Sequence, residues 1–409
     1  MRYGTAAGGL RYAVRRSGSP VAYCALSIRC GTRDEAGYHG GIAHFVEHTL
    51  FKGTSKRSAT AINSYLDRLG GELNAFTTKE EIVLHATVLR EDLRKAAGLL
   101  FDIATDATFP EREVETEKGV VIDEIASYKD SPADDIYDRF EQMLFEGHPL
   151  SGLILGTAAS VRKTGSEELR RFVREKFVPS AMAFTVVADE DEAKMEKWVL
   201  SIAEKYFEGT PAVQQQAVEP VPVVPSIFDK TVNRRNHQVN CILGSVAPSL
   251  YEHRERVAAV LLANILAGPA SNSILNAILR EKNGWVYGVE CSYTQYRDSG
   301  MMAVSFGCDR ENLDRCLRVV EREIARLQEE PLSPSRLKAA KKQLLGQLAI
   351  SGDNGETQCL SMGKTLLAYG YVADDGDNRR RIEEITSEDI MKAAGSIFAP
   401  GRVSKLVYL

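Results

Sequence analysis

The sequence predicts an α+β protein of two homologous domains, each an antiparallel sheet with helices packed on one face. Two observations carry this prediction. A proline-rich segment divides the chain, and the same order of strands and helices occurs on both sides of it. The chain has 409 residues, which is too long for one hydrophobic core and suits two domains.

The predicted linker is the segment 209–225, which contains four prolines and three consecutive glutamines. Proline at this density favours an extended spacer without helix. We therefore expect an N-terminal domain over residues 1–208 and a C-terminal domain over residues 226–409.

The internal repeat compares residues 85–125 with residues 304–349. In each, a strand-like stretch precedes Arg-Glu-Asp/Asn-Leu, a long amphipathic helix, a proline turn and a second charged helix. The offset is 220 residues at Arg90 and Arg310, and 224 at Pro110 and Pro334. This steady offset favours duplication, although chance similarity of two α+β segments is the alternative. Alternating apolar residues predict strands at 11–15, 22–29, 73–77, 82–89 and 183–188, and at 239–245, 288–294 and 301–307.

Composition narrows the class of protein. Hydrophobic residues make up 44 % and charged residues 26 % of the chain, which is typical of globular proteins, and the net charge of -5 offers no basic footprint for nucleic acid. No apolar run approaches the roughly 20 residues of a membrane helix, and the start lacks the apolar stretch of a signal peptide. We expect a cytoplasmic protein whose seven scattered cysteines are reduced core thiols, with one reactive thiol as the alternative.

The most informative motif is His44-Phe45-Val46-Glu47-His48. Histidines four residues apart share one face of a helix, which suits two ligands of one zinc ion. Glu47 follows His44 by three residues and lies near enough to act on a water at that metal. The pattern inverts the commoner His-Glu-x-x-His zinc motif. The alternative is a surface histidine pair, but the apolar flanks predict a short, mostly buried helix.

A catalytic zinc usually has three protein ligands, so a further carboxylate is expected. Glu117 and Glu124 are the best candidates because they lie two helical turns apart on one face of a predicted helix. The alternative is a solvated helix face, because acidic residues crowd this stretch. The residues alone leave that choice open.

At this point the chain resembles the M16 metallopeptidases, in which the inverted motif precedes a glutamate in a Val-Ile-x-Glu-Ile context. The resemblance implies a half-clamshell of two domains with one Zn²⁺ per chain. It implies that His44, His48 and Glu124 bind the metal, that Glu47 is the general base, and that Glu117 supports the site from behind the ligands.

The resemblance also implies where a peptide substrate binds. Residues 70–77 resemble the edge strand of the family, in which Asn74, Ala75 and Phe76 would pair with an extended peptide. In the second half, Leu-Arg-Glu-Lys-Asn-Gly-Trp-Val-Tyr-Gly resembles the substrate-contacting segment of the family. Arg280 and Tyr287 fall on its two contact positions, and the tyrosine would help to stabilise the oxyanion.

The second half carries no expected metal site, because residues 257–279 contain neither histidine nor glutamate. It departs from the family at residues 267–271, where the expected glycine-rich loop is poorer in glycine, and at Trp285, where leucine is common. These departures bear on substrate preference.

The sequence thus predicts a zinc metalloendopeptidase, a hydrolase that cleaves extended peptides or unfolded segments. Two domains are half of the four that enclose the site in larger family members, so we expect a homodimer, with a heterodimer of related chains as the alternative. The alternative functions are a non-catalytic or partner subunit and a zinc-storage or zinc-sensing protein.

Overall fold

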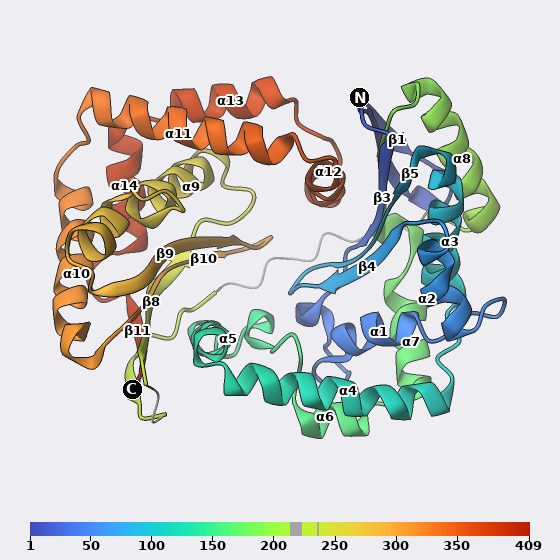
Figure 1. The fold of residues 1–409 in the computed structure, drawn as a ribbon, viewed down its shortest axis with the longest axis horizontal. Coiled ribbons are helices and arrows are strands. Elements are labelled where there is room, and N and C mark those ends of the chain that lie inside the picture. Colours follow the sequence, from blue (N-terminus) through green and yellow to red (C-terminus); the bar gives the residue numbers. More distant parts are fainter. Residues whose placement is uncertain (213–222, 235–236) are drawn as a thin grey trace. The chain divides into compact units, whose positions relative to one another are not determined.

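The protein is described here by a computed structural model that covers residues 1–212, 223–234 and 237–409. The chain forms two compact units (Figure 1). Unit 1 is built mainly from the first half of the chain and also contains Ile350–Ala373, whereas unit 2 is built mainly from the second half and also contains Ser127–Ser151.

The units therefore differ from the halves expected from the sequence in two exchanged segments. Residues 127–151 were assigned to the N-terminal domain and pack in unit 2, and residues 350–373 were assigned to the C-terminal domain and pack in unit 1. Of the predicted linker 209–225, residues 213–222 lie outside the described residues. Its described flanks, 210–212 and 223–225, contain neither helix nor strand.

Unit 1 contains a six-stranded sheet in the order β1-β2-β6-β3-β5-β4. Neighbouring strands are antiparallel except β2 and β6, which are parallel. Strand β4 is the last strand of this order, and within the described ranges it pairs with β5 and with no other strand. The strands are β1 (Arg2–Thr5), β2 (Arg11–Arg16), β3 (Val21–Ile28), β4 (Glu72–Thr77), β5 (Ile82–Leu89) and β6 (Met182–Ala188).

Unit 2 contains a five-stranded sheet in the order β7-β11-β8-β10-β9. Here β7 and β11 are the parallel pair, and the other neighbours are antiparallel. The strands are β7 (Asp229–Val232), β8 (Val239–Ala247), β9 (Val286–Gln295), β10 (Gly300–Cys308) and β11 (Ser404–Tyr408).

The two sheets support the predicted duplication. If β1 is set aside, the order β2-β6-β3-β5-β4 of unit 1 matches the order β7-β11-β8-β10-β9 of unit 2 strand for strand. The parallel pair occupies the same place in both sheets. Shared connectivity of five strands, together with the repeated helix pair after β5 and β10, is the expected result of duplicating one α+β unit.

One face of each sheet is covered by helices from the same half of the chain, and the buried apolar side chains between them form the main cores. Unit 1 holds α1 (Ile42–Leu50), α2 (Ala59–Asp67), α3 (Leu93–Asp106), most of α4 (Glu111–Asp130), α6 (Ala158–Lys163), α7 (Ser166–Lys176) and α8 (Glu192–Phe207). Unit 2 holds α9 (His253–Ala267), the π-helix η6 (Asn276–Lys282), α10 (Leu313–Glu329), most of α11 (Pro334–Gly352), α13 (Asp375–Glu384) and α14 (Ser387–Ile397).

The other face of each sheet is covered by a helix from the opposite half of the chain, which differs from the expected single helical face. Helix α12 (Gly355–Tyr369) packs on β6, β3 and β2 in unit 1, and α5 (Pro132–Leu144) packs on β8 and β11 in unit 2 (Figure 1). Alternation along the strands separates the two faces: Leu26 belongs to the main core of unit 1, whereas Ala25 packs with α12. The fold class is otherwise as predicted.

Helix α12 approaches its sheet closely because it has small residues at the contact. A Cβ atom at Gly363 would lie 2.5 Å from the Ser27 hydroxyl, so a larger residue there would require Ser27 to move. The Thr185 hydroxyl on β6 donates to the Cys359 carbonyl at 2.9 Å, and Arg11 on β2 donates to the Leu366 carbonyl at 3.1 Å. These bonds tie the exchanged helix to unit 1.

Two expectations from composition can be compared with the structure. All seven cysteines are buried and none is joined in a disulfide, as expected for core thiols. Among the described residues, no helix is both long enough and apolar enough to cross a bilayer.

Candidate metal centre

The helix that carries the motif begins at a close crossing of two loops. Gly41 precedes α1 with φ +86, the left-handed conformation that glycine adopts readily, and a Cβ atom there would lie 2.7 Å from the Leu155 carbonyl oxygen. The buried Glu35 carboxylate accepts hydrogen bonds from the Gly41 and Ala43 amides at 2.8 and 2.9 Å. These contacts satisfy otherwise unpaired amides at the start of α1 and fix where the helix begins.

Three side chains from α1 and α4 converge at one point in unit 1. One donor atom each from His44, His48 and Glu124 lie within 4.8 Å of one another. The Nε2 atoms of His44 and His48 are 3.7 and 3.3 Å from Glu124 Oε2, and the two imidazole centroids are 4.6 Å apart. The predicted choice of Glu124 over Glu117 as the third member of the cluster agrees with this geometry.

The donor set fits a divalent transition metal. Burial, together with the neighbouring His48, lowers the pKa of His44 to about 3, so its ring is neutral at physiological pH and can offer a lone pair. Two imidazole nitrogens and one carboxylate oxygen are the kind of ligand set that catalytic zinc sites use, with a fourth position left open. A buried neutral histidine beside a carboxylate is costly to keep without such a partner.

Glu117 lies behind His48, as expected of a supporting residue. Its Oε1 is 3.0 Å from His48 Nδ1, which leaves Nε2 of that ring for the metal position, and its Oε2 is 2.6 Å from Lys52 Nζ. Burial opposes ionisation of Glu117, but the hydrogen bonds from His48 and Lys52 prevail and lower its pKa. A carboxylate in this place fixes the orientation and tautomer of the ligand ring.

Glu47 lies beside the cluster but outside the set of three donors. The Thr77 hydroxyl, at the end of β4, donates to Glu47 Oε2 at 2.6 Å. Burial raises the pKa of Glu47, and the bond from Thr77 and the charge of His48 partly offset that rise. A carboxylate with a raised pKa next to a metal position suits a general base, because its proton affinity moves toward neutral pH.

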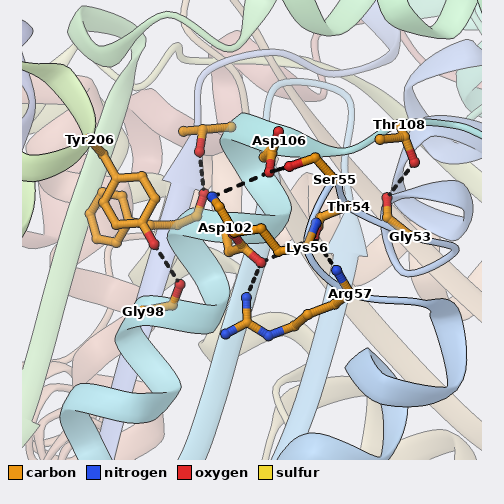
Figure 2. Close-up of polar contacts among 12 residues, drawn as sticks. Gly53, Thr54, Ser55, Lys56, Arg57, Gly98, Asp102, Asp106, Thr108 and Tyr206 are labelled. Carbon is orange, nitrogen blue, oxygen red and sulfur yellow. Dashed lines mark hydrogen bonds and ion pairs between the residues drawn. The ribbon is translucent and has the colours of Figure 1, made fainter.

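The loop after α1 is anchored by a buried carboxylate on α3 (Figure 2). Asp102 is 1 % exposed and binds the side chains of Thr54, Lys56 and Arg57, with the Thr54 and Lys56 distances both 3.2 Å. Figure 2 also shows Lys56 reaching Asp106. The loop that leads away from His48 is therefore fixed to the helix that precedes α4.

This anchor leads to a prediction on stability. Arg57→Met is expected to lower the free energy of unfolding by about 2 kcal/mol, because it leaves the buried Asp102 carboxylate with weaker compensation. Asp102→Asn is expected to cost less, about 1 kcal/mol, because Arg57 and Lys56 are partly exposed and can be solvated. Urea denaturation of both variants measures their free energies of unfolding. An Asp102→Asn variant that is less stable than Arg57→Met would contradict the prediction.

The predicted substrate residues lie in two places. Asn74, Ala75 and Phe76 lie on β4, and no strand among the described residues pairs with its outer edge. Phe76 is 36 % exposed.

Arg280 and Tyr287 belong to unit 2, on η6 and β9. Arg280 lines a pocket of about 560 Å³ with Tyr137, Asn276 and Glu290, and Tyr287 is 64 % exposed. Both are available to a ligand, and their contribution to the site of unit 1 stays a prediction.

Sequence reasoning missed three residues that support the cluster: Glu35, Lys52 and Thr77. Lys52 follows His48 by four residues but lies beyond the end of α1 at Leu50, so helical spacing does not place it. Glu35 contacts the start of α1, and Thr77 contacts Glu47. Both contacts form only when the chain is folded. No spacing in the sequence points to either bond.

The fold and the cluster together define a duplicated α+β protein with a candidate metal centre in its first unit, and comparisons place it in a family. Residues 11–158 match the family model for insulinase (peptidase family M16), and residues 165–344 match the model for the peptidase M16 inactive domain. The chain belongs to the M16 peptidase family. The site residues on α1 and α4 all fall within the first of these matches.

Relatives extend over most of the chain. An uncharacterized zinc protease of Streptomyces coelicolor is 30 % identical over 376 residues, covering 90 % of this chain and 80 % of the relative. An uncharacterized zinc protease of Bacillus subtilis is 29 % identical over 364 residues, covering 88 % and 85 %. The predicted family is therefore confirmed, and the names of these relatives support a zinc protease at the level of the family.

Two solved structures share the fold. A protease from Helicobacter pylori has a TM-score of 0.89 at 19 % identity, covering 100 % of this chain and 98 % of that one. A peptidase M16 inactive domain from Pseudomonas fluorescens has a TM-score of 0.88 at 19 % identity, covering 100 % and 97 %. At this identity the likeness shows the fold alone.

Proposed function

We propose that this chain is a zinc-dependent endopeptidase that hydrolyses extended peptides or unfolded segments. The observation that carries the proposal is the convergence of His44, His48 and Glu124 on one point, with Glu47 beside them. A metal cluster alone would suit storage, but storage has no use for a half-buried carboxylate that lies next to the donors without joining them.

The chemistry follows from the donor set and its neighbours. His44, His48 and Glu124 would hold one Zn²⁺ per chain, with Glu117 orienting His48. A bound zinc ion lowers the pKa of a coordinated water to about 7 and polarises a carbonyl group. Glu47 would take a proton from the attacking water and return it to the leaving amine.

The substrate is expected to be an extended chain. The outer edge of β4 can accept a peptide as an added strand, which reads the backbone and leaves side chains to set preference. Asn74, Ala75 and Phe76 would make these contacts. Arg280 would bind a carbonyl or carboxylate of the substrate with its fork of donors, and Tyr287 would help to stabilise the oxyanion.

Metal analysis with a quenched-peptide assay tests the proposal. Purified protein is expected to contain about one zinc per chain and to cleave unfolded peptides, to lose turnover in a chelator, and to regain it with added zinc. A folded protein of the same composition should be a poor substrate. Zinc-loaded protein that cleaves no member of an unfolded peptide library would overturn the endopeptidase assignment.

The second candidate is a non-catalytic or partner subunit of a heterodimeric M16-type peptidase. It is favoured by the match of residues 165–344 to a domain described as inactive. Two facts weigh against it for the whole chain: the donor cluster lies outside that match, and all of its members are present. Zinc bound without turnover, followed by turnover on addition of a related chain, is the result that would favour this candidate.

We also propose that the active form is a homodimer in the cytoplasm. The chain carries two of the four domains that enclose the site in larger family members, and it has both the donor cluster and the Arg280 and Tyr287 pair. Self-pairing of one chain would therefore supply two equivalent sites. Sedimentation or size-exclusion chromatography at several concentrations measures the oligomeric state. A monomer that is fully active would contradict the proposed homodimer.

A further inference from the structure

The bond between Thr77 and Glu47 joins the strand proposed to bind substrate to the residue proposed as the base. Thr77 is the last residue of β4, and its hydroxyl donates to Glu47 Oε2 on α1 at 2.6 Å. Alternation along β4 places Ala75 and Thr77 on the same face, so Thr77 points to the side of the sheet on which α1 packs.

The bond gives the two carboxylate oxygens of Glu47 different roles. Thr77 occupies Oε2, and no other hydrogen bond to Glu47 occurs among the described residues. In the proposed mechanism, Oε1 is therefore the oxygen that remains to accept a proton. A carboxylate on a free side chain rotates about its last bond, and one fixed donor removes most of that freedom.

Thr77 itself is held firmly. It pairs with the buried Ile82 on β5 in the antiparallel register. The next residue, Thr78, closes the hairpin with its backbone amide on the Glu81 carbonyl at 2.8 Å and its hydroxyl accepting from the Glu81 amide at 2.9 Å. A donor fixed by a strand and a turn can impose its geometry on the side chain that it binds.

We infer that Thr77 is a positioning residue that orients Glu47 for proton transfer, so that the strand which binds the peptide also places the base. The inference rests on the proposed function, because it needs Glu47 to act as that base. Its chemical content is a single hydrogen bond, with Thr77 as donor and Glu47 as acceptor, that persists while the other oxygen exchanges a proton. No bond to substrate is required of Thr77.

Removing the hydroxyl while keeping the shape tests the inference. Thr77→Val, which is nearly isosteric, is expected to lower kcat about tenfold with KM changed by less than about twofold, since orientation acts in the reacting complex. Thr77→Ser keeps the donor and is expected to restore kcat to within about threefold of the parent. Thr105→Val is the matched control, because its hydroxyl only bonds the Phe101 carbonyl within α3.

Two further measurements distinguish a positioning role of Thr77 from a structural role. Zinc content and the melting temperature should be the same in Thr77→Val and the parent. A Thr77→Val protein that loses zinc or melts early, or a Thr77→Ser protein as slow as Thr77→Val, would overturn the positioning role. Equal kcat in parent and Thr77→Val would overturn it as well.

Failure of the proposed function gives a different result from failure of this inference. If the zinc-loaded parent cleaves no peptide, the endopeptidase assignment fails and Thr77 has no base to orient. If the parent is active and Glu47→Gln is not, but Thr77→Val matches the parent, the enzyme stands and only the positioning role is lost.

Discussion

Replacing Glu47 with glutamine is expected to lower peptide hydrolysis by a factor of roughly 10² to 10⁴ while zinc content stays at the parent level. Glutamine has the shape of glutamate and can still accept the Thr77 hydrogen bond through its carbonyl oxygen. It cannot take a proton at neutral pH, so only the base function is removed. Because Glu47 is not one of the three converging donors, the metal should remain bound.

The comparison needs initial rates on one quenched peptide and zinc measured by mass spectrometry on the same preparations. Glu115→Gln on α4 is the matched control, since Glu115 is exposed and its ion pair is with Lys118, away from the donors. Unchanged rates are expected in that control. Turnover retained by Glu47→Gln would assign the base to another group, and loss of zinc would mean that Glu47 supports the donors rather than the water.

The parts of the fold that sequence reasoning found are those with strong local signals. Strand β5 was predicted with its observed bounds, because residues 82–89 are apolar and β-branched between polar turns. The strands β1, β7 and β11 were missed. The first two have four residues each and are largely exposed, so they lack the alternation that marks a half-buried strand.

The exchange of α5 and α12 between the units could not be read from the sequence. Helix α12 has small residues at its contact, such as Cys359 and Gly363, which predict close packing on some surface. They do not say which of two homologous sheets supplies it, because the sequence of a helix does not by itself identify its partner surface. In the structure, the second face of unit 1 is lined by small residues such as Ala25, and that of unit 2 by larger ones such as Ile242. Only the tertiary contacts, such as the bond from Thr185 to Cys359, decide that choice.

The site residues also divide into those that local spacing predicts and those that it does not. His44, Glu47 and His48 lie within one short helix, so their relation follows from helical spacing alone. The place of Glu124 required the family pattern, because Glu117 offered an equally good carboxylate two turns away on the same face of an acidic helix. The structure separates the two by the donors that they meet: Glu124 faces Nε2 of both rings, and Glu117 faces Nδ1 of His48.

The different positions of Glu124 and Glu117 lead to a second prediction with a large expected effect, on zinc binding. Glu124→Ala and His44→Ala are each expected to reduce bound zinc from about one ion per chain to a small fraction, because the two protein ligands that remain hold zinc poorly without the third. Glu117→Gln is expected to weaken zinc binding only about 10- to 100-fold, since it removes the partner of a ligand and not a ligand. The order of affinities is therefore parent, then Glu117→Gln, then Glu124→Ala and His44→Ala.

Competition with a chromophoric chelator measures these affinities without reference to turnover, and Glu115→Gln again serves as the control that should match the parent. Cobalt substitution adds a check on geometry, because a three-ligand site and a two-ligand site differ in their visible absorption. Glu124→Ala protein that binds zinc as tightly as the parent would move the third ligand to Glu117. The latter side chain would then have to leave Lys52 and His48 Nδ1, two contacts of 2.6 and 3.0 Å that hold it away from the cluster.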